Sequence, residues 1–227
     1  MRKKANTIAN SPSTSSSGRG KTKAQRVFLD LRSRILAGQF PPETRLTLRP
    51  LAKEYGTGIN AVSDAVKALA AEGLVELEGQ AGARVIPRDL ERIRGEYILR
   101  MVIECETARR CAELADETQM CILENMAAKV DRLFEEGHQL SECRNADIQF
   151  HLTIATFSGV PVLRDALAPL LDRLVALDQT EKRTLEIPGQ KHQEVYEGLK
   201  TRDPAIASDV MQKHLQHSMN LSLALLF

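Results

Sequence analysis

The chain has 227 residues, a net charge of +1 and 4% aromatic residues, with no tryptophan. This length fits one or two domains, and no apolar stretch reaches the roughly 18 residues of a membrane span, so a cytoplasmic protein is expected. The scarcity of aromatic side chains argues against a protein that stacks the bases of RNA or of single-stranded DNA.

Charge is distributed unevenly along the chain. Residues 1–86 contain 14 Lys and Arg against 7 Asp and Glu, whereas residues 87–227 contain 17 against 23. Successive segments of opposite net charge indicate that the first segment meets a polyanion and that the second does not.

The first 23 residues differ in composition from the rest. They contain six basic residues, no acidic residue and many Ser and Gly. Such a segment buries too little apolar surface to offset its ordering entropy, so residues 1–23 are predicted to be a disordered basic arm. This arm either contacts DNA or is a solvated tail, and its composition fits both interpretations.

Three helices are predicted to follow the arm. Apolar residues recur at helical spacing from Ala24 through Ile35. The run "LRPLAKEYG" predicts a short second helix that Gly56 ends, and "INAVSDAVKALAAEGLV" predicts a third helix with a glycine at its C-terminus. The β-like runs "LVELEG" and "ARVIP", on either side of "QAG", then predict a hairpin.

This order of elements indicates a winged helix-turn-helix domain over residues 24–87. The second helix of the pair would enter the major groove of double-stranded DNA, because that groove admits a helix and shows a distinct pattern for each base pair. The alternative is a small α+β domain that binds nothing, which the charge asymmetry and the basic arm disfavour.

Strand signals disappear after Pro87, and residues 88–227 are predicted to form an all-α antiparallel bundle of about six helices. Asp116 opens the second of these helices, and the third covers "NADIQFHLTIATFSG". Pro161 begins the fourth helix, and "IPGQ" breaks the chain before the fifth. Asp203-Pro204 begins the last helix, which is expected to run to Leu225.

Several segments carry a family likeness. The run from Val27 to Val85 resembles the winged helix of GntR-type bacterial transcription regulators, and the helical half resembles the FCD effector domain of their FadR-like branch. In the helical half the matching segments are "YILRMVIE", "DIQFH" followed by "FSG", "KHQEVYEGLKTRDPAIA" and "MQKHL". The resemblance implies a homodimeric, ligand-responsive DNA-binding protein, not an enzyme, in which residues 88–227 bind the effector and form the dimer.

The predicted recognition helix departs from the family pattern. Where relatives read S-R-T-P-V-R-E-A-L, this chain reads "GINAVSDAV", so Ile59 and Ser63 replace two arginines. Because arginine reads guanine bidentately, the usual base contacts do not carry over. Arg49 matches a DNA-contacting arginine of the family. The candidate DNA-binding residues are Arg45, Arg49, Asn60, Ser63, Lys67 and Arg84.

Asp147 and His151 lie four residues apart in a predicted helix, so their side chains share one face. In the family resembled, such a pair forms a metal site with one histidine from each of the last two helices, and His192 and His214 match those positions. Three imidazoles and one carboxylate suit Zn, Ni, Mn or Fe better than Ca or Mg. On an octahedral ion these ligands would leave two positions for water or for a small organic acid, the expected effector. The competing interpretation is a chance coincidence of unrelated residues.

Two further residues have alternative roles. His217 is the main rival ligand to His214, because it follows that residue by three positions on the same helix. Arg100 matches a family arginine that faces the effector cavity, where a guanidinium would hold the effector's carboxylate. The alternative for Arg100 is an exposed helix arginine paired with Glu96 or Glu104.

Two other functions compete with a ligand-responsive regulator. One is a metal-dependent enzyme, since two histidines and a carboxylate also describe non-heme iron sites. A fourth protein ligand leaves less room for substrate and oxygen, and an enzyme would leave the winged helix unexplained. The other is an architectural DNA-binding dimer without a ligand, which added metal would not stabilise.

Overall fold

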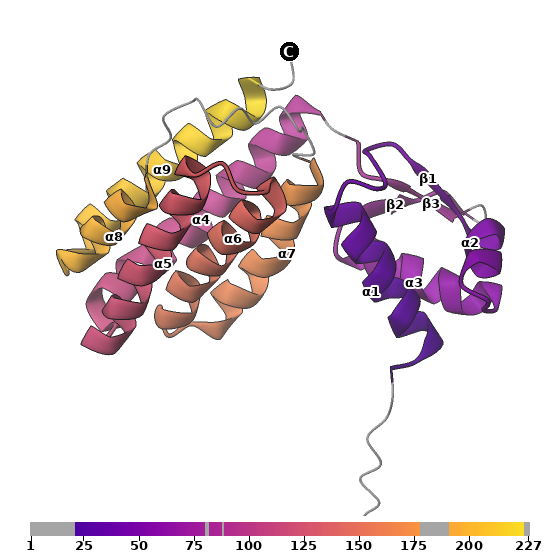
Figure 1. Cartoon of the computed structure of the whole chain (residues 1–227), viewed down its shortest axis with the longest axis horizontal. Coiled ribbons are helices and arrows are strands. Elements are labelled where there is room, and N and C mark those ends of the chain that lie inside the picture. The colour runs from indigo at the N-terminus through magenta and orange to yellow at the C-terminus, as the bar shows by residue number, and fades with distance from the viewer. Residues whose placement is uncertain (1–20, 80–81, 88, 178–190, 225–227) are drawn as a thin grey trace, which may run out of the picture.

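The computed structural model describes residues 21–79, 82–87, 89–177 and 191–224. They form a small lobe of helices and short strands and a larger lobe made only of helices (Figure 1). The predicted winged helix-turn-helix followed by an all-α bundle is therefore confirmed. Residues 1–20 of the predicted arm and the "IPGQ" segment lie outside the described residues. No described helix is both long enough and apolar enough to cross a bilayer.

Helix α1 (Lys23–Leu36) begins one residue inside the predicted arm. Thr22 and Gln25 form a capping box, in which each side chain accepts a hydrogen bond from the other residue's backbone N–H. The apolar stripe of α1 is buried, as its spacing predicts. The helix begins earlier than its apolar periodicity predicts because the capping box stabilises a polar first turn.

Helices α2 (Leu48–Glu54) and α3 (Ile59–Ala71) form the predicted helix-turn-helix. The turn between them includes Gly56 with φ of 56°, a left-handed conformation that glycine adopts without a steric penalty. The apolar side of α3 packs toward α1 and α2. The opposite side of α3 is exposed.

The wing is a three-stranded antiparallel sheet, although only the β2–β3 hairpin is predicted from the sequence. Its strands lie in the order β1-β3-β2, with bounds β1 (Arg45–Thr47), β2 (Val75–Leu77) and β3 (Gly82–Val85). A strand of three residues is too short to show an alternating pattern, so β1 leaves no clear sequence signal.

Gly82 is required where β3 meets β1. Its φ is 137°, and a Cβ built on it would lie 2.0 Å from the backbone oxygen of Leu46. Thr47 is its partner in the register of the two strands. Any side chain at this position would force the two strands apart, so the wing depends on glycine here.

The larger lobe is a bundle in which α4 packs against α9, α6 and α7, and α5 packs against α6 and α8. Helix α6 begins at Leu140 rather than at Asn145 as predicted, because its first turns carry little apolar sequence. The described part of α9 ends next to the predicted end at Leu225. The helices are α4 (Leu90–Leu114), α5 (Glu117–Glu135), α6 (Leu140–Phe157), α7 (Pro161–Leu177), α8 (His192–Lys200) and α9 (Pro204–Ala224).

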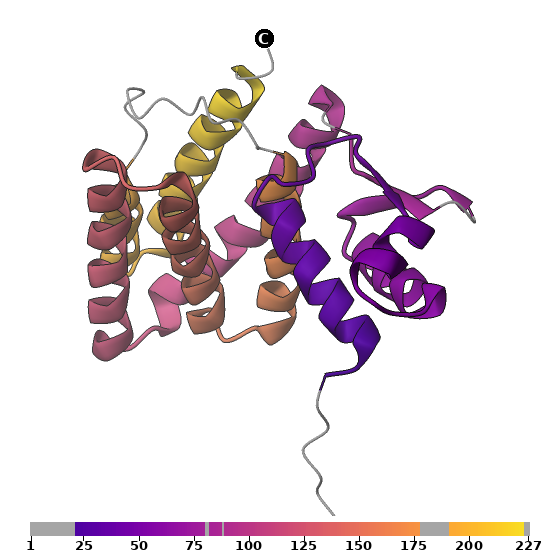
Figure 2. The same ribbon diagram turned by 45° about the vertical axis from the view of Figure 1, so that its right-hand side comes forward.

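The two lobes meet where α1 lies beside α7 (Figure 2). Arg32 of α1 pairs with Glu72, at 2.9 Å, and with Asp172 of α7. The next residue on α7, Arg173, pairs with Glu96 of α4 at 2.8 Å. We call these five residues the interlobe ion-pair cluster. Apolar residues of α4 and α7 join the core of the small lobe beneath it, so part of the larger lobe packs into the core of the small one.

Candidate metal centre

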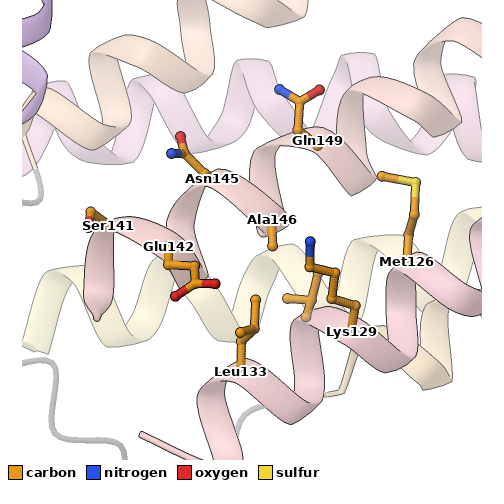
Figure 3. A pocket seen from close by; sticks show the side chains of 9 residues that line it. Met126, Lys129, Leu133, Ser141, Glu142, Asn145, Ala146 and Gln149 are labelled. Atoms are coloured by element: carbon orange, nitrogen blue, oxygen red, sulfur yellow. The ribbon is translucent and has the colours of Figure 1, made fainter. Parts of the chain in front are cut away.

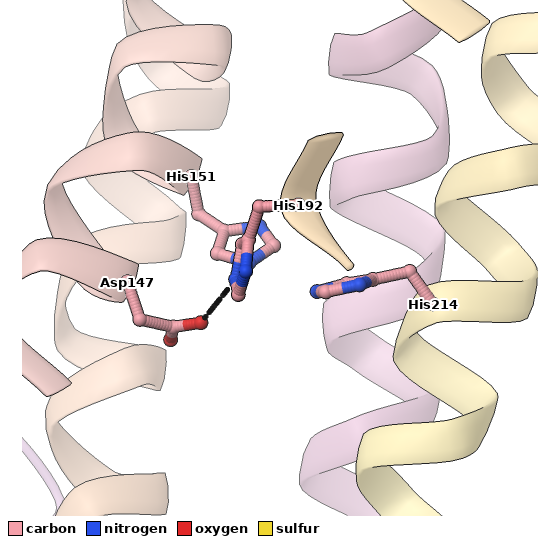
Figure 4. Close-up of side chains that lie close together, drawn as sticks. All are labelled: Asp147, His151, His192 and His214. Atoms are coloured by element: carbon pink, nitrogen blue, oxygen red, sulfur yellow. Dashed lines mark hydrogen bonds and ion pairs between the residues drawn. The ribbon is translucent and has the colours of Figure 1, made fainter. Parts of the chain in front are cut away.

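Four potential metal ligands converge in the middle of the bundle (Figure 4). Asp147 and His151 lie on α6, His192 is the first residue of α8, and His214 lies on α9. One ligand atom from each residue lies within 4.8 Å of every other. Two ligands of one ion are separated by at most about twice the 2.0–2.2 Å bond, so a small contraction would bring all four onto an ion.

The three histidines occupy positions in apolar helix stripes. On α6, His151 follows the inward positions of Cys143 and Phe150 at helical spacing, and all three side chains are fully buried. His192 and His214 are also buried, within the apolar faces of α8 and α9. Buried polar groups need partners, so three imidazoles in a core indicate a site rather than packing.

Two more carboxylates lie behind the cluster. Glu104 of α4 accepts a hydrogen bond from Nδ1–H of His151. Asp131 of α5 accepts one from Nδ1–H of His192 at 2.9 Å, and it also accepts the backbone N–H groups of His192 and Gln193 at the start of α8. In each case the carboxylate turns Nε2 of the ring toward the cluster, which is how proteins orient metal-binding histidines.

The donor set fits a divalent transition metal. Nε2 of His151 is buried without a hydrogen-bond partner, 3.7 Å from Oδ1 of Asp147, and the ligand types are the nitrogen and oxygen donors that such metals prefer. Burial alone would raise the pKa of Asp147, but the His151 and His192 rings hold it well below its usual range. Burial and the two neighbouring rings hold the pKa of His214 well below its usual range. The cluster therefore offers a carboxylate and a neutral imidazole.

Metal uptake is expected to release a proton from His192. Burial lowers the pKa of this ring, but hydrogen bonds to Asp131 and Asp147 outweigh burial and raise it to about 9. Because Nε2 donates to Asp147 at 2.8 Å, a metal must displace that proton, and the apparent affinity should rise about tenfold per pH unit toward the raised pKa. Zinc titration calorimetry at about pH 7 and about pH 8 measures this; equal affinities at the two values would contradict it.

Arg100 lies next to the cluster and is buried. The alternative interpretation of an exposed helix arginine is therefore wrong in its exposure. Its Nε donates to Oε1 of Glu104 at 2.5 Å, whereas Glu96 pairs with Arg173 instead. Within the described residues, its two terminal NH₂ groups have no hydrogen-bond acceptor. Burial opposes the charge, but Glu104 and Asp147 raise the pKa of Arg100, so the guanidinium stays charged.

The other histidines lie elsewhere. His217 is partly buried on α9 and is not among the four converging residues. Three residues turn a helix by about 300°, so the side chain of His217 points about 60° away from that of His214 around the helix axis. His138 is exposed beside Glu136 and Glu142. The rival assignment of His217 as a ligand in place of His214 therefore has no geometric support.

A hollow of about 420 Å³ lies between α5 and α6, beside the cluster (Figure 3). Its lining residues include Val130, which precedes Asp131, and Ala146, which precedes Asp147. None of the four converging residues lines it. Of those four, Asp147 keeps the largest exposed fraction, 27% of its side chain.

The candidate DNA-binding residues lie on the helix-turn-helix and the wing. On α3, Asn60, Ser63 and Lys67 recur at helical spacing along the side opposite the core. Arg49 is exposed on α2. Ile59, one of the two residues that replace family arginines, has an exposed fraction of 44%, so an apolar side chain stands at the start of the recognition helix.

Both basic residues of the wing pair with the same glutamate. Arg45 lies 3.3 Å from Glu78, and Arg84 lies 2.8 Å from it. Arg84 also approaches Glu43 at 3.4 Å, the position at which the chain turns with a positive φ. These pairs place both guanidinium groups on one side of the sheet.

The fold and the buried cluster together define the class of the protein. A winged helix-turn-helix joined to a helical lobe that contains a buried polar site is the architecture of a DNA-binding transcription regulator. Residues 23–85 match the family described as "Bacterial regulatory proteins, gntR family", and residues 97–217 match the FCD domain. The chain therefore belongs to the GntR family, in the group with an FCD domain, and it is a transcription regulator, not an enzyme.

Relatives of known name include repressors. The chain is 25% identical over 195 residues to the HTH-type transcriptional repressor RspR of Escherichia coli, with 85% of each chain covered. It is 26% identical over 195 residues to the HTH-type transcriptional repressor GlaR of Escherichia coli, which covers 82% of this chain and 89% of the relative.

Solved structures show the same fold. E. coli McbR/YncC superposes with a TM-score of 0.72 at 18% identity, over 92% of this chain and 100% of that one. A putative transcriptional regulator GntR from Rhodococcus sp. RHA1 superposes with a TM-score of 0.72 at 20% identity, over 89% of this chain and 98% of that one. At these identities the likeness concerns the fold alone.

Proposed function

We propose that this protein is a homodimeric regulator in which a metal-bound small carboxylate controls binding to an operator. Residues 24–87 bind DNA, and residues 88–227 bind the effector and form the dimer. Asp147, His151, His192 and His214 hold a divalent transition metal, Zn, Ni, Mn or Fe. The metal supplies a Lewis-acidic cation that a carboxylate can ligate directly.

One observation carries the metal assignment. The buried Nε2 of His151 has no hydrogen-bond partner, yet it points toward three other potential ligands. A buried polar atom without a partner costs free energy, and a metal at this point would remove that cost. A chance coincidence of unrelated residues would not align both His151 and His192 with a carboxylate behind each ring.

The effector is a small organic acid because a second anion-binding group lies beside the cluster. The terminal NH₂ groups of Arg100 are available for a bidentate pair with a carboxylate. Glu104 contacts both Arg100 and the cluster residue His151, so the guanidinium and the cluster lie on either side of one carboxylate. A carboxylate bound between the metal and Arg100 would lie between two positive charges, both opposite in sign to its own.

A homodimer is supported by an exposed apolar strip on α4. Ile98, Leu99 and Val102 have exposed fractions of 50%, 45% and 66%, and an unpartnered apolar strip is typical of a protein interface. A two-fold dimer should occupy a pseudo-palindrome. DNase footprinting tests the proposal: we expect two related half-sites, with affinity that changes when zinc and an acid are added, and a single asymmetric half-site would contradict it.

The basic arm is expected to add affinity that does not depend on DNA sequence. Deletion of residues 1–20 removes four of its six positive charges. If the arm binds phosphates, the slope of log K against log salt should become shallower by about 0.9 for each phosphate that is no longer neutralised. Fluorescence anisotropy with operator and with unrelated duplex, at several salt concentrations, measures the slope; the same slope with and without the arm would make it a solvated tail.

A further inference from the structure

One buried carboxylate touches both the metal cluster and the arginine beside it. Oε2 of Glu104 accepts a hydrogen bond from His151, and Oε1 accepts one from Arg100 at 2.5 Å. The side chains of Glu104 and His151 are fully buried, and that of Arg100 is 7% exposed. Each oxygen of Glu104 is therefore committed to a different functional group.

These two contacts determine how both neighbours are presented. Because a carboxylate only accepts, His151 carries its proton on Nδ1 and leaves Nε2 for the cluster. Because Glu104 engages Arg100 through Nε, both terminal NH₂ groups remain available on the other edge of the guanidinium. Neither ring nor guanidinium can turn without breaking a buried, charge-assisted hydrogen bond.

We propose that Glu104 is a positioning residue that sets the metal ligand and the anion-binding arginine together. Metal affinity and carboxylate affinity then both depend on one side chain that itself touches neither ligand. This inference rests on the proposed function, since it concerns the same metal and acid. It assigns to Glu104 a role in linking the two.

The bundle contains a matched control for this idea. Asp131 supports His192 as Glu104 supports His151, but its other contacts are backbone N–H groups at the start of α8. Asp131 makes no contact with Arg100 among its hydrogen bonds and ion pairs within the described residues. Loss of the Asp131 carboxylate should therefore weaken metal binding without affecting the arginine.

The first measurement uses cobalt(II) alone. Glu104→Gln keeps the size of the side chain but places an amide NH₂ against a donor, so the cobalt affinity should fall about 10- to 100-fold. Asp131→Asn should lower it by a similar factor. The visible absorption of bound cobalt should also change in Glu104→Gln, because it reports the position of the His151 ligand and not the stability of the fold.

The second measurement uses carboxylate probes on protein saturated with cobalt. Acetate, lactate and citrate are titrated, and the tightest wild-type binder is followed in each variant by the cobalt spectrum. Its affinity should fall about tenfold or more in Glu104→Gln and by a clearly smaller factor in Asp131→Asn, which leaves the contacts of Arg100 in place. Glu104→Asp keeps the charge but cannot reach both partners, so it should lose affinity for cobalt and for the probe alike. This variant replaces Glu104→Gln in the test if Glu104→Gln does not fold.

The outcomes separate this inference from the proposed function. A wild-type protein that binds no cobalt, or none of the three acids, overturns the proposed function and the linkage with it. A wild-type protein that binds both, with a folded Glu104 variant that matches it in cobalt affinity and spectrum, overturns the inference alone. So does a variant that loses cobalt affinity but binds the probe normally once saturated.

Discussion

Replacement of His151 by alanine is expected to abolish metal binding and effector response together, while operator binding survives. The imidazole is one of the four proposed ligands on three helices, so its loss should cost more than the roughly 10- to 100-fold that follows a change behind a ligand. Coupling between effector and DNA sites is typically about 1–3 kcal/mol, or roughly 5- to 150-fold in operator affinity. That factor should fall to about one in the variant, because no metal remains to hold the acid.

His217→Ala is the matched control for this experiment. It removes the same side chain from the same lobe, but His217 lies outside the four converging residues. Metal content by mass spectrometry and operator affinity with and without acid should both match the wild type. A His151→Ala protein that carries no metal yet responds normally to acid would show that the ion is not part of the switch.

The second large effect is expected in the other lobe, from Gly82→Ala. The new Cβ would lie 2.0 Å from the backbone oxygen of Leu46, and backbone cannot give way as a flexible side chain does. Strand β3 would separate from β1, which should cost about 3 kcal/mol or more and disrupt the wing. Operator affinity should then be lost, whereas the bundle should still bind zinc.

Gly79→Ala separates steric overlap from backbone strain. Gly79 also has a positive φ, of 60°, but a Cβ there would meet nothing within 4 Å. This variant should lose only the roughly 1–2 kcal/mol of a left-handed residue. Urea denaturation followed by circular dichroism compares the two, and equal losses of stability would mean that the overlap with Leu46 is not the cause.

The helices of both lobes follow from apolar periodicity, because long amphipathic stripes leave a strong signal. Asp147 and His151 are also predictable, since four residues bring two side chains to one helix face. His192 and His214 carry no such local signal and emerge only from the family resemblance. A shared site that brings together residues far apart in sequence depends on how helices pack, which no local pattern contains.

The supporting residues of the site are harder to predict. Helix α4 carries charged residues on all its sides, so nothing in its sequence distinguishes the buried pair of Arg100 and Glu104 from surface pairs such as that of Arg109 and Glu106. Asp131 looks like an ordinary polar residue of α5. It becomes important only because the start of α8, without a side-chain cap of its own, docks against it. Burial of Glu104 and docking of α8 on Asp131 depend on how the helices pack, so a local sequence pattern does not show them.

The interlobe ion-pair cluster bears on which regulatory sites this protein can occupy. Arg32 of α1 pairs with Asp172 of α7, and Arg173 of α7 donates to the backbone oxygen of Glu72 at the end of α3, so in a dimer the distance between the two recognition helices should vary little. One extra base pair between half-sites separates them by about 3.4 Å and rotates them by about 34–36°. Neither change can be absorbed by a loose tether, so the natural targets in a genome should share one spacing, and evolution of new targets should preserve that spacing before it preserves individual bases.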